Sequence, residues 1–257
     1  MKKCLIKLTL ICLAFVFLMP SLNANAKEYH WYCKRNKDNK QPICDESFNF
    51  IEEYGGIYLD KKHGDSNSER VIYLTFDVGY ENGNVTRILD VLKSEEVKGS
   101  FFILGNVIEK ESELTKRLAD EGHLVCNHTL THKNLTGALV EEFNLELSAL
   151  EEKYRSLTGR ELAKFFRPPE GTFDAEMLKR AYALGYKTVF WSFAYFDWDN
   201  DKQMSREAAM KKILENVHNG EIMLLHPTGK TNADIMQELI RELKSAGYRF
   251  GTLDEIE

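Results

Sequence analysis

The chain has 257 residues, of which 43% are hydrophobic, and a formal net charge of −6 at pH 7. These values indicate a globular protein with one large domain. They exclude a typical nucleic-acid-binding protein, whose affinity depends on many Lys and Arg contacts to phosphate, and the sequence implies no obligate protein partner.

The first 26 residues have the layout of a secretory signal peptide. Lys2 and Lys3 precede an apolar stretch, and Ala24-Asn25-Ala26 is a cleavage site of small residues. The stretch is short for a stable membrane span, although an uncleaved membrane anchor remains an alternative. Cleavage of residues 1–26 removes three lysines and no acidic residue, so the net charge falls from −6 to about −9. We therefore expect an exported protein.

Three cysteines follow this segment, and an odd number excludes a complete disulfide framework. Cys33 and Cys44 could close a short loop in an oxidising compartment or could both stay reduced. Cys126 lies in an apolar run, which indicates a buried small side chain. Residues 27–69 are polar with scattered aromatic residues, and we interpret them as an N-terminal extension packed on a main domain of residues 70–257.

A regular alternation of strands and helices begins at residue 71. The expected strands are rich in β-branched and aromatic residues, and the expected helices carry apolar residues at helical spacing and end near glycines. The strands are expected at residues 71–76, 100–104, 124–126, 188–193, 222–225 and 249–252, with a short apolar pair at 165–166. The helices are expected at residues 85–95, 113–120, 139–157, 175–184, 206–217 and 233–246.

This repetition predicts an α/β fold with a parallel sheet and crossover helices. An open doubly wound sheet and a closed barrel share the pattern. The first strand is not followed by the Gly-x-Gly-x-x-Gly turn that marks the nucleotide-binding open form. Polar residues do follow the strand ends, which a barrel gathers at one face. We therefore expect a (β/α) barrel of about seven strands.

Two histidines suggest a metal site. His128 and His132 are four residues apart, and on a helical turn this spacing puts both imidazoles on one face, within reach of one cation. Neutral imidazole suits zinc and related ions. The expected cofactor is a divalent metal ion, with zinc ahead of cobalt, manganese and magnesium.

The other polar positions suggest hydrolytic chemistry. Asp77 could act as a general base, or it could cap a loop. Arg167 could hold Asp77 ionised, or it could be an ordinary ion-pair partner. Asp197 could orient either Arg167 or His226, and His226 could protonate the leaving group or be structural.

The ordered set resembles the polysaccharide deacetylase family, also called the NodB homology domain or carbohydrate esterase family 4. The motifs that carry the resemblance lie between residues 71 and 253. They are Thr75-Phe76-Asp77-x-Gly79, His128-Thr129-x-x-His132, Arg167-Pro168-Pro169-x-Gly171, Asp197-Trp198 and Leu224-x-His226.

The resemblance implies a deformed (β/α)7-type barrel and metal-dependent removal of an acetyl group from a glycan. It assigns Asp77 as the base, Arg167 as the partner of that base and His226 as the acid, which Asp197 tunes. It makes His128 and His132 the metal ligands and places the backbone N–H of Glu170 where the family stabilises the oxyanion. Trp198 is interpreted either as a wall of the sugar site or as core packing.

One position departs from the family pattern. Most members have a second Asp after the base as the third metal ligand, but this chain has Val78. The delta-lactam-biosynthetic de-N-acetylase branch of spore-forming bacteria also lacks this Asp. It resembles this chain in the Gly79-Tyr80-Glu81-Asn82-Gly83 continuation, in Phe190-Trp191-Ser192 before Asp197-Trp198, and in the aromatic extension.

Similarity to that branch implies a defined substrate and location. The substrate would be N-acetylmuramic acid in peptidoglycan glycan strands, and the product would lead to the muramic delta-lactam of spore cortex. The protein would act in the cell wall or spore envelope. The alternatives are a deacetylase of N-acetylglucosamine polymers or acetylated xylan, and a glycan-binding relative that has lost catalysis.

Overall fold

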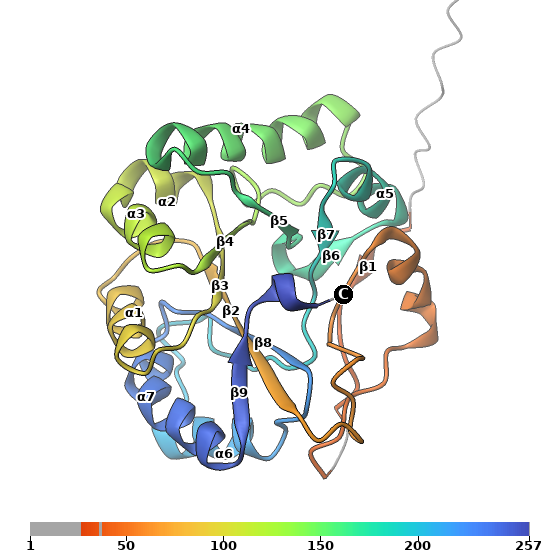
Figure 1. Cartoon of the computed structure of the whole chain (residues 1–257). Coiled ribbons are helices and arrows are strands. Elements are labelled where there is room, and N and C mark those ends of the chain that lie inside the picture. Colours follow the sequence, from red (N-terminus) through yellow and green to blue (C-terminus); the bar gives the residue numbers. More distant parts are fainter. Residues whose placement is uncertain (1–26, 36–37, 257) are drawn as a thin grey trace, which may run out of the picture.

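The computed structural model describes residues 27–35 and 38–256, so the expected signal peptide lies outside the described residues. In this part of the chain a curled sheet of parallel strands is surrounded by a ring of helices (Figure 1). The strands of the sheet are β2 (Arg70–Val78), β3 (Ser100–Ile103), β4 (Leu124–Asn127), β5 (Ala163–Phe166), β7 (Lys187–Thr188), β8 (Glu221–Leu225) and β9 (Tyr248–Gly251).

The hydrogen-bonded order of the strands makes the sheet a deformed barrel. The order is β7-β5-β4-β3-β2-β8, and β9 pairs with the first half of β2. A parallel bridge between Phe193 and Met223 then brings the chain after β7 beside β8. The two ends of the sheet are thereby connected, and the expected (β/α)7-type barrel is confirmed.

The expected strand at residues 188–193 is wrong in its extent. Only Lys187–Thr188 forms a regular strand, paired with β5. Beyond it the partner changes at each step, because Val189 bridges Ile57 of the extension and Phe193 bridges Met223 of β8. A segment that changes partners so quickly cannot form a continuous ladder.

The helices follow the expected apolar spacing, with one addition. They are α1 (Asn84–Ser94), α2 (Gly105–Lys110), α3 (Ser112–Asp120), α4 (Val140–Thr158), α5 (Ala175–Ala183), α6 (Arg206–Leu214) and α7 (Lys230–Ser245). Helix α2 was not expected, because its six residues are too few to show a helical period. In α1 the residues at helical spacing are fully buried, namely Val85, Ile88, Leu89 and Leu92.

The N-terminal extension packs along one side of the barrel, from the turn after β5 to the amino ends of the strands, where Leu59 bridges Glu221. Its strand β1 (Tyr29–His30) pairs antiparallel with β6 (Thr172–Phe173), and it also forms the 3-10 helix η1 (Glu46–Tyr54). Trp31 stacks on Phe190 with ring centroids 4.5 Å apart, and its indole N–H donates to the carbonyl of Trp191 at 2.9 Å. The extension therefore supports the segment that carries Trp191.

The cysteines behave largely as expected. Cys126 is fully buried, so the prediction for this residue is confirmed. Cys33 and Cys44 are both partly buried free thiols in this structure. They pack against the same hydrophobic cluster of the extension and α5.

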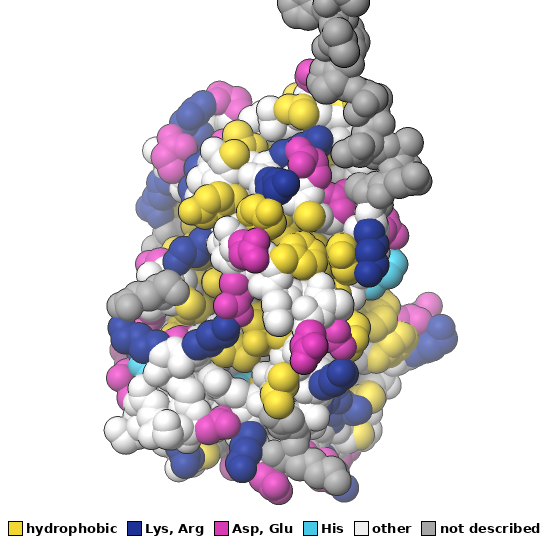
Figure 2. All heavy atoms as spheres, turned by 90° about the vertical axis from the view of Figure 1, so that its right-hand side faces the viewer, with side chains coloured by type: hydrophobic (Ala, Val, Ile, Leu, Met, Phe, Trp, Pro, Cys, Tyr) yellow, Lys and Arg dark blue, Asp and Glu magenta, His cyan; other side chains and the backbone are white. Residues whose placement is uncertain are grey.

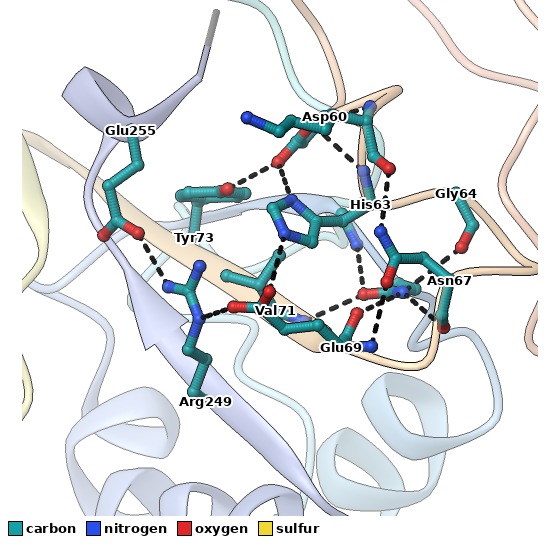
Figure 3. A network of polar contacts seen from close by, with 12 residues as sticks. Asp60, His63, Gly64, Asn67, Glu69, Val71, Tyr73, Arg249 and Glu255 are labelled. Carbon is teal, nitrogen blue, oxygen red and sulfur yellow. Dashed lines mark hydrogen bonds and ion pairs between the residues drawn. The ribbon is translucent and has the colours of Figure 1, made fainter.

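The amino ends of the strands are closed by a network of polar side chains (Figure 3). Asp60 is its centre: one carboxylate oxygen accepts from Tyr73 Oη at 2.6 Å and contacts His63 Nδ1 at 2.6 Å. His63 and Asp60 are both buried. The network continues outward through Glu69, Arg249 and Glu255, the last in the 3-10 helix η3 (Leu253–Glu255).

The face formed by the extension and α5 carries basic and acidic side chains interspersed (Figure 2). Figure 2 shows no continuous basic surface on the described part of this face, in keeping with the acidic composition. None of the helices in residues 27–35 and 38–256 combines the length and apolar character needed to span a bilayer.

Candidate active site

A cleft of about 690 Å³ opens at the carboxyl ends of the strands. This volume is within the usual range for a small-molecule site, about 300–1,000 Å³. The cleft is lined by six of the eight residues that the sequence singled out, namely Asp77, His128, His132, Glu170, Trp198 and His226. The other two, Arg167 and Asp197, lie behind them as hydrogen-bond partners.

Asp77 lies next to the last residue of β2, and its side chain is 10% exposed. Its Oδ1 accepts a hydrogen bond from Arg167 at 2.7 Å, and its Oδ2 lies 3.6 Å from His128 Nε2. Burial opposes ionisation, but the charges of Arg167, His128 and His226 outweigh it and hold the pKa of Asp77 below its ordinary value. Asp77 is therefore a carboxylate at neutral pH.

Arg167 is fully buried and held on several sides. Its guanidinium donates to Thr75 Oγ1 at 2.9 Å and to the carbonyl of Val189 at 3.1 Å, in addition to its bond with Asp77. The same group lies 4.1 Å from the ring centroid of Phe102. A guanidinium fixed in this way can neither leave Asp77 nor contact a ligand, so its role is to orient the carboxylate.

The two histidines come together through a loop, so the expected helical turn is wrong. After β4, Thr129 and His132 adopt positive φ angles of 74° and 61°, and the imidazoles of His128 and His132 have centroids 4.9 Å apart. The loop is held from α4, because Glu146 accepts from the N–H and the hydroxyl of Thr131 at 2.9 and 2.7 Å.

The tautomer of His128 follows from its partner. Nδ1 lies 2.9 Å from the carbonyl oxygen of Arg167, which can only accept, so Nδ1 carries the proton. Burial lowers the pKa of His128 to about 4, outweighing the charge of Asp77. At neutral pH the ring is neutral and presents an unprotonated Nε2 to the cleft, as a metal ligand requires.

His226 pairs with Asp197, which resolves the open choice of partner for that carboxylate. Asp197 is 1% exposed, and its Oδ1 lies 2.7 Å from Nδ1 of His226. Burial alone would lower the pKa of His226, but the hydrogen bond and charge of Asp197, with the charge of Asp77, raise it above its ordinary value. His226 is thus a proton donor that faces the cleft.

Another wall of the cleft is formed by the 3-10 turn η2 (Pro169–Gly171). Glu170 has a positive φ of 58°, an uncommon conformation that occurs at functional sites. Gly171 follows with φ 66°, and an added Cβ would lie 2.7 Å from Trp191. The turn therefore requires glycine at position 171.

Trp198 lies at the mouth of the cleft. It is 56% exposed, and its ring lies 5.9 Å from that of His226. Of the two earlier interpretations, the wall of the site therefore fits the structure and core packing does not. Trp191, whose indole packs on Gly171, lines the interior of the same cleft.

The protein donors for a metal ion are few. Within residues 27–35 and 38–256 no group of three or more His, Cys, Asp or Glu side chains could hold a metal. Val78 is fully buried in the apolar core, so it supplies no donor. Two imidazoles remain, whereas catalytic zinc sites ordinarily have three protein ligands. The donor set fits a weakly held ion and does not fit a tightly bound one.

Several residues that support the site gave no signal in the sequence. They are Asn127 and Glu146 under the histidine loop, and Tyr195 and Asn232 behind Asp197. Each is a buried polar residue inside a strand, helix or irregular segment, and only its distant partner shows its role. Local spacing could not have found them.

Comparison with known proteins agrees with this geometry. The family described as polysaccharide deacetylase matches residues 64–189. The peptidoglycan-N-acetylmuramic acid deacetylase PdaA of Bacillus subtilis is 37% identical over 228 residues, covering 88% of this chain and 85% of the relative. A peptidoglycan-N-acetylglucosamine deacetylase of Bacillus cereus is 34% identical over 210 residues, covering 80% and 73%.

Solved structures show the same relationship. The structure of Bacillus subtilis PdaA, a family 4 carbohydrate esterase, superposes with a TM-score of 0.84 at 36% identity and covers 90% of this chain and 97% of that one. A family 4 carbohydrate esterase from Bacillus anthracis gives a TM-score of 0.73 at 33% identity, covering 90% and 96%.

Proposed function

Because the chain belongs to the polysaccharide deacetylase family of enzymes, we propose that it removes the acetyl group from N-acetylmuramic acid in peptidoglycan. The observation that carries the proposal is that one cleft contains a candidate general base, Asp77 held by Arg167, and a candidate general acid, His226 held by Asp197. Amide hydrolysis needs one group to accept a proton from water and another to protonate the leaving nitrogen.

Asp77 is the base in this proposal. Its carboxylate is ionised, aimed by Arg167 and open to the cleft through Oδ2. It accepts the proton of the water that attacks the acetyl carbonyl carbon. Because Arg167 is fully buried and bonded on other sides, it keeps Asp77 oriented throughout.

His226 is the acid. The hydrogen bond and charge of Asp197 raise the pKa of His226, which favours the protonated ring that an acid requires. When the C–N bond breaks, the ring donates its proton to the sugar nitrogen, and acetate and a free 2-amine leave. The backbone N–H of Glu170, in a turn on the wall of the cleft, would donate to the oxyanion formed in between.

A divalent ion, zinc first, would be held by His128 and His132, with water or substrate completing its shell. When bound, such an ion polarises a carbonyl and acidifies water. With two protein ligands its affinity should be lower than that of a three-ligand site. Calorimetric titration of the metal-free protein with zinc tests this: His132→Ala should abolish binding, and Val78→Asp should tighten it. Zinc binding unchanged by His132→Ala would contradict the assignment.

The substrate is proposed from similarity to PdaA, which is described as a peptidoglycan-N-acetylmuramic acid deacetylase. The freed 2-amine of muramic acid can attack the lactyl carboxyl group of the same sugar and form a delta-lactam with loss of water, the modification of spore cortex. The signal-like residues 1–26 support export to the cell wall or spore envelope. The partner is then the glycan strand itself.

The experiment is acetate release from peptide-free peptidoglycan by the protein in the presence of zinc, cobalt, manganese or magnesium. Muramic acid without its acetyl group should appear among the digestion products. Glucosamine in its place would favour the second candidate, an N-acetylglucosamine deacetylase, which the 34% identity to such an enzyme keeps open.

A non-catalytic relative is the remaining alternative. A family 4 pseudoenzyme of Bacillus anthracis, 28% identical, superposes with a TM-score of 0.68. This alternative predicts that the protein binds glycan but releases no acetate with zinc, cobalt, manganese or magnesium. The presence of both Asp77 with Arg167 and His226 with Asp197 supports the hypothesis of an active enzyme.

A further inference from the structure

We propose that Asn232 is a positioning residue for the acid of this site. It fixes Asp197 and the loop of His226 so that the imidazole keeps its acidic nitrogen toward the cleft. The inference deepens the proposed function and rests on it for the meaning of His226 as the acid. None of the family motifs that the sequence displays contains Asn232.

Asn232 connects the side chain of Asp197 to the backbone of His226. It lies in the first turn of α7 and is fully buried. Its Nδ2 group donates one hydrogen bond to Asp197 Oδ2 at 2.7 Å and one to the backbone carbonyl of His226 at 3.0 Å. One carboxamide therefore holds two segments that are 29 residues apart in the chain.

Asp197 is consequently held at both oxygens. Oδ1 meets Nδ1 of His226, while Oδ2 accepts from the backbone N–H of His226 at 2.9 Å and from Asn232. A carboxylate fixed in this way cannot rotate about its terminal bond without breaking these three hydrogen bonds. Nδ1–H of His226 therefore stays hydrogen-bonded to Asp197, and Nε2 is the nitrogen that can donate a proton into the cleft.

The orientation of the Asn232 amide follows from its neighbours. The carboxylate of Asp197 can only accept, so the NH2 group must face it and Oδ1 must face the other way. There Oδ1 accepts from the hydroxyl of Tyr195, a buried residue that lines the cleft. The chain Tyr195, Asn232, Asp197, His226 therefore connects the wall of the cleft to its acid.

A purely structural role is the competing explanation, since any buried hydrogen-bonded Asn stabilises its surroundings. Asn219 provides a matched control at the amino ends of the strands. It is also buried, accepts from the backbone N–H of Val71 at 2.8 Å and donates to the carbonyl of Glu69 at 2.8 Å. Within the described part of the chain, its side-chain hydrogen bonds go to the segment before β2 and to the neighbouring Gly220, not to Asp197 or His226.

The experiment compares Asn232→Leu with Asn219→Leu. For Asn232→Leu we expect kcat to fall about 10- to 100-fold, the range known for outer hydrogen-bond partners of metal-bound histidines, with KM within about twofold because substrate contacts remain. Asn219→Leu should lower the melting temperature and leave kcat unchanged. An Asn232→Leu variant that melts lower but keeps the wild-type kcat would overturn the proposal.

A second readout does not depend on turnover. The Nδ1 proton of His226, bonded to Asp197, should give a resolved NMR signal in the metal-free wild-type protein, assigned by its loss in His226→Gln. Asn232→Leu should abolish that signal by exchange with water, and Asn219→Leu should retain it. A retained signal in Asn232→Leu refutes the positioning role, even if no glycan is ever deacetylated.

Asn232→Asp covers the case in which the leucine variant does not fold, because it keeps the shape of the amide. The new carboxyl group lies against Asp197, and two buried carboxyl groups this close share one proton. It can then keep a hydrogen bond to Asp197 but not the one to the His226 carbonyl, so kcat should fall below that of the wild type. A wild-type kcat would contradict the proposal.

Discussion

The two ends of the barrel carry the same kind of chemistry with opposite consequences. Asp197 and His226 lie 2.7 Å apart at the carboxyl ends of the strands, and Asp60 and His63 lie 2.6 Å apart at the amino ends. The His226 side chain is 26% exposed to a cleft, whereas that of His63 is 9% exposed beneath surrounding polar groups. An Asp–His pair therefore indicates catalysis only where the second ring nitrogen can reach a substrate.

The charged partners differ in the same way. At the cleft, Arg167 is wholly buried and leaves one oxygen of Asp77 free for chemistry. At the other end, Arg249 is 40% exposed and bridges Glu69 and Glu255 (Figure 3), both of them more than 40% exposed. The first arrangement orients Asp77, and the second joins the start of β9 and the 3-10 helix η3 to the start of β2.

The largest expected effect is the loss of activity when Asp77, the candidate base at the cleft, is replaced. Asp77→Asn should reduce kcat by about 10²–10⁴-fold, the usual contribution of a general base, because the amide cannot accept the proton of water. Acetate release measures the loss, and circular dichroism should show an intact fold. Activity within tenfold of wild type would mean that another group is the base.

The next effect concerns the pH dependence. Turnover needs ionised Asp77, whose pKa is lowered, and protonated His226, whose pKa is raised. Activity should therefore fall as the pH drops through the lowered pKa of Asp77 and as it rises through the raised pKa of His226. Kinetic pH profiles of kcat with Asp197→Asn should show the upper loss moved to lower pH and a rate about 10- to 100-fold lower. If the high-pH loss of kcat does not move in this variant, His226 is not the group whose titration causes it.

The corresponding change at the other end should affect stability only. Asp60→Asn removes the acceptor shared by His63 and Tyr73, which should lower the free energy of unfolding by about 1–3 kcal/mol. Burial opposes ionisation of Asp60, but its hydrogen bonds lower its pKa overall, so this stabilisation is present at neutral pH and is lost as the pH falls through the lowered pKa. Urea titration at pH 7 and at low pH measures both, and kcat should match wild type.

The smallest expected effect is on substrate binding at the mouth of the cleft, measured as KM. Trp198→Ala removes an exposed ring from the mouth of the cleft and should raise KM about two- to tenfold, since an aromatic contact contributes about 0.5–1.5 kcal/mol. Leu184→Ala, an exposed apolar residue after α5, is the control and should leave KM unchanged. Equal effects of the two substitutions would show that Trp198 makes no specific contact.

Much of this site could be predicted because its groups follow recognisable strands. Asp77 ends a run of buried β-branched and aromatic residues, and Arg167 and His226 each follow a short apolar strand. Parallel strands place their carboxyl ends at one face, so the polar residues after them had to meet. The helical turn for His128 and His132 was wrong because a spacing of four residues does not reveal the positive φ angles of a loop.

The sequence by itself determined the alternation of strands and helices, the family and the candidate residues of the site, because periodicity and motif spacing are local properties of the chain. Only the tertiary structure decided that Asp197 serves His226 and not Arg167, and that Asn232 and Glu146 hold the two sides of the cleft. It also showed that Asp60 and His63 are closed to substrate. Those outcomes depend on which distant segments pack together and on whether a ring nitrogen is left facing an open cavity.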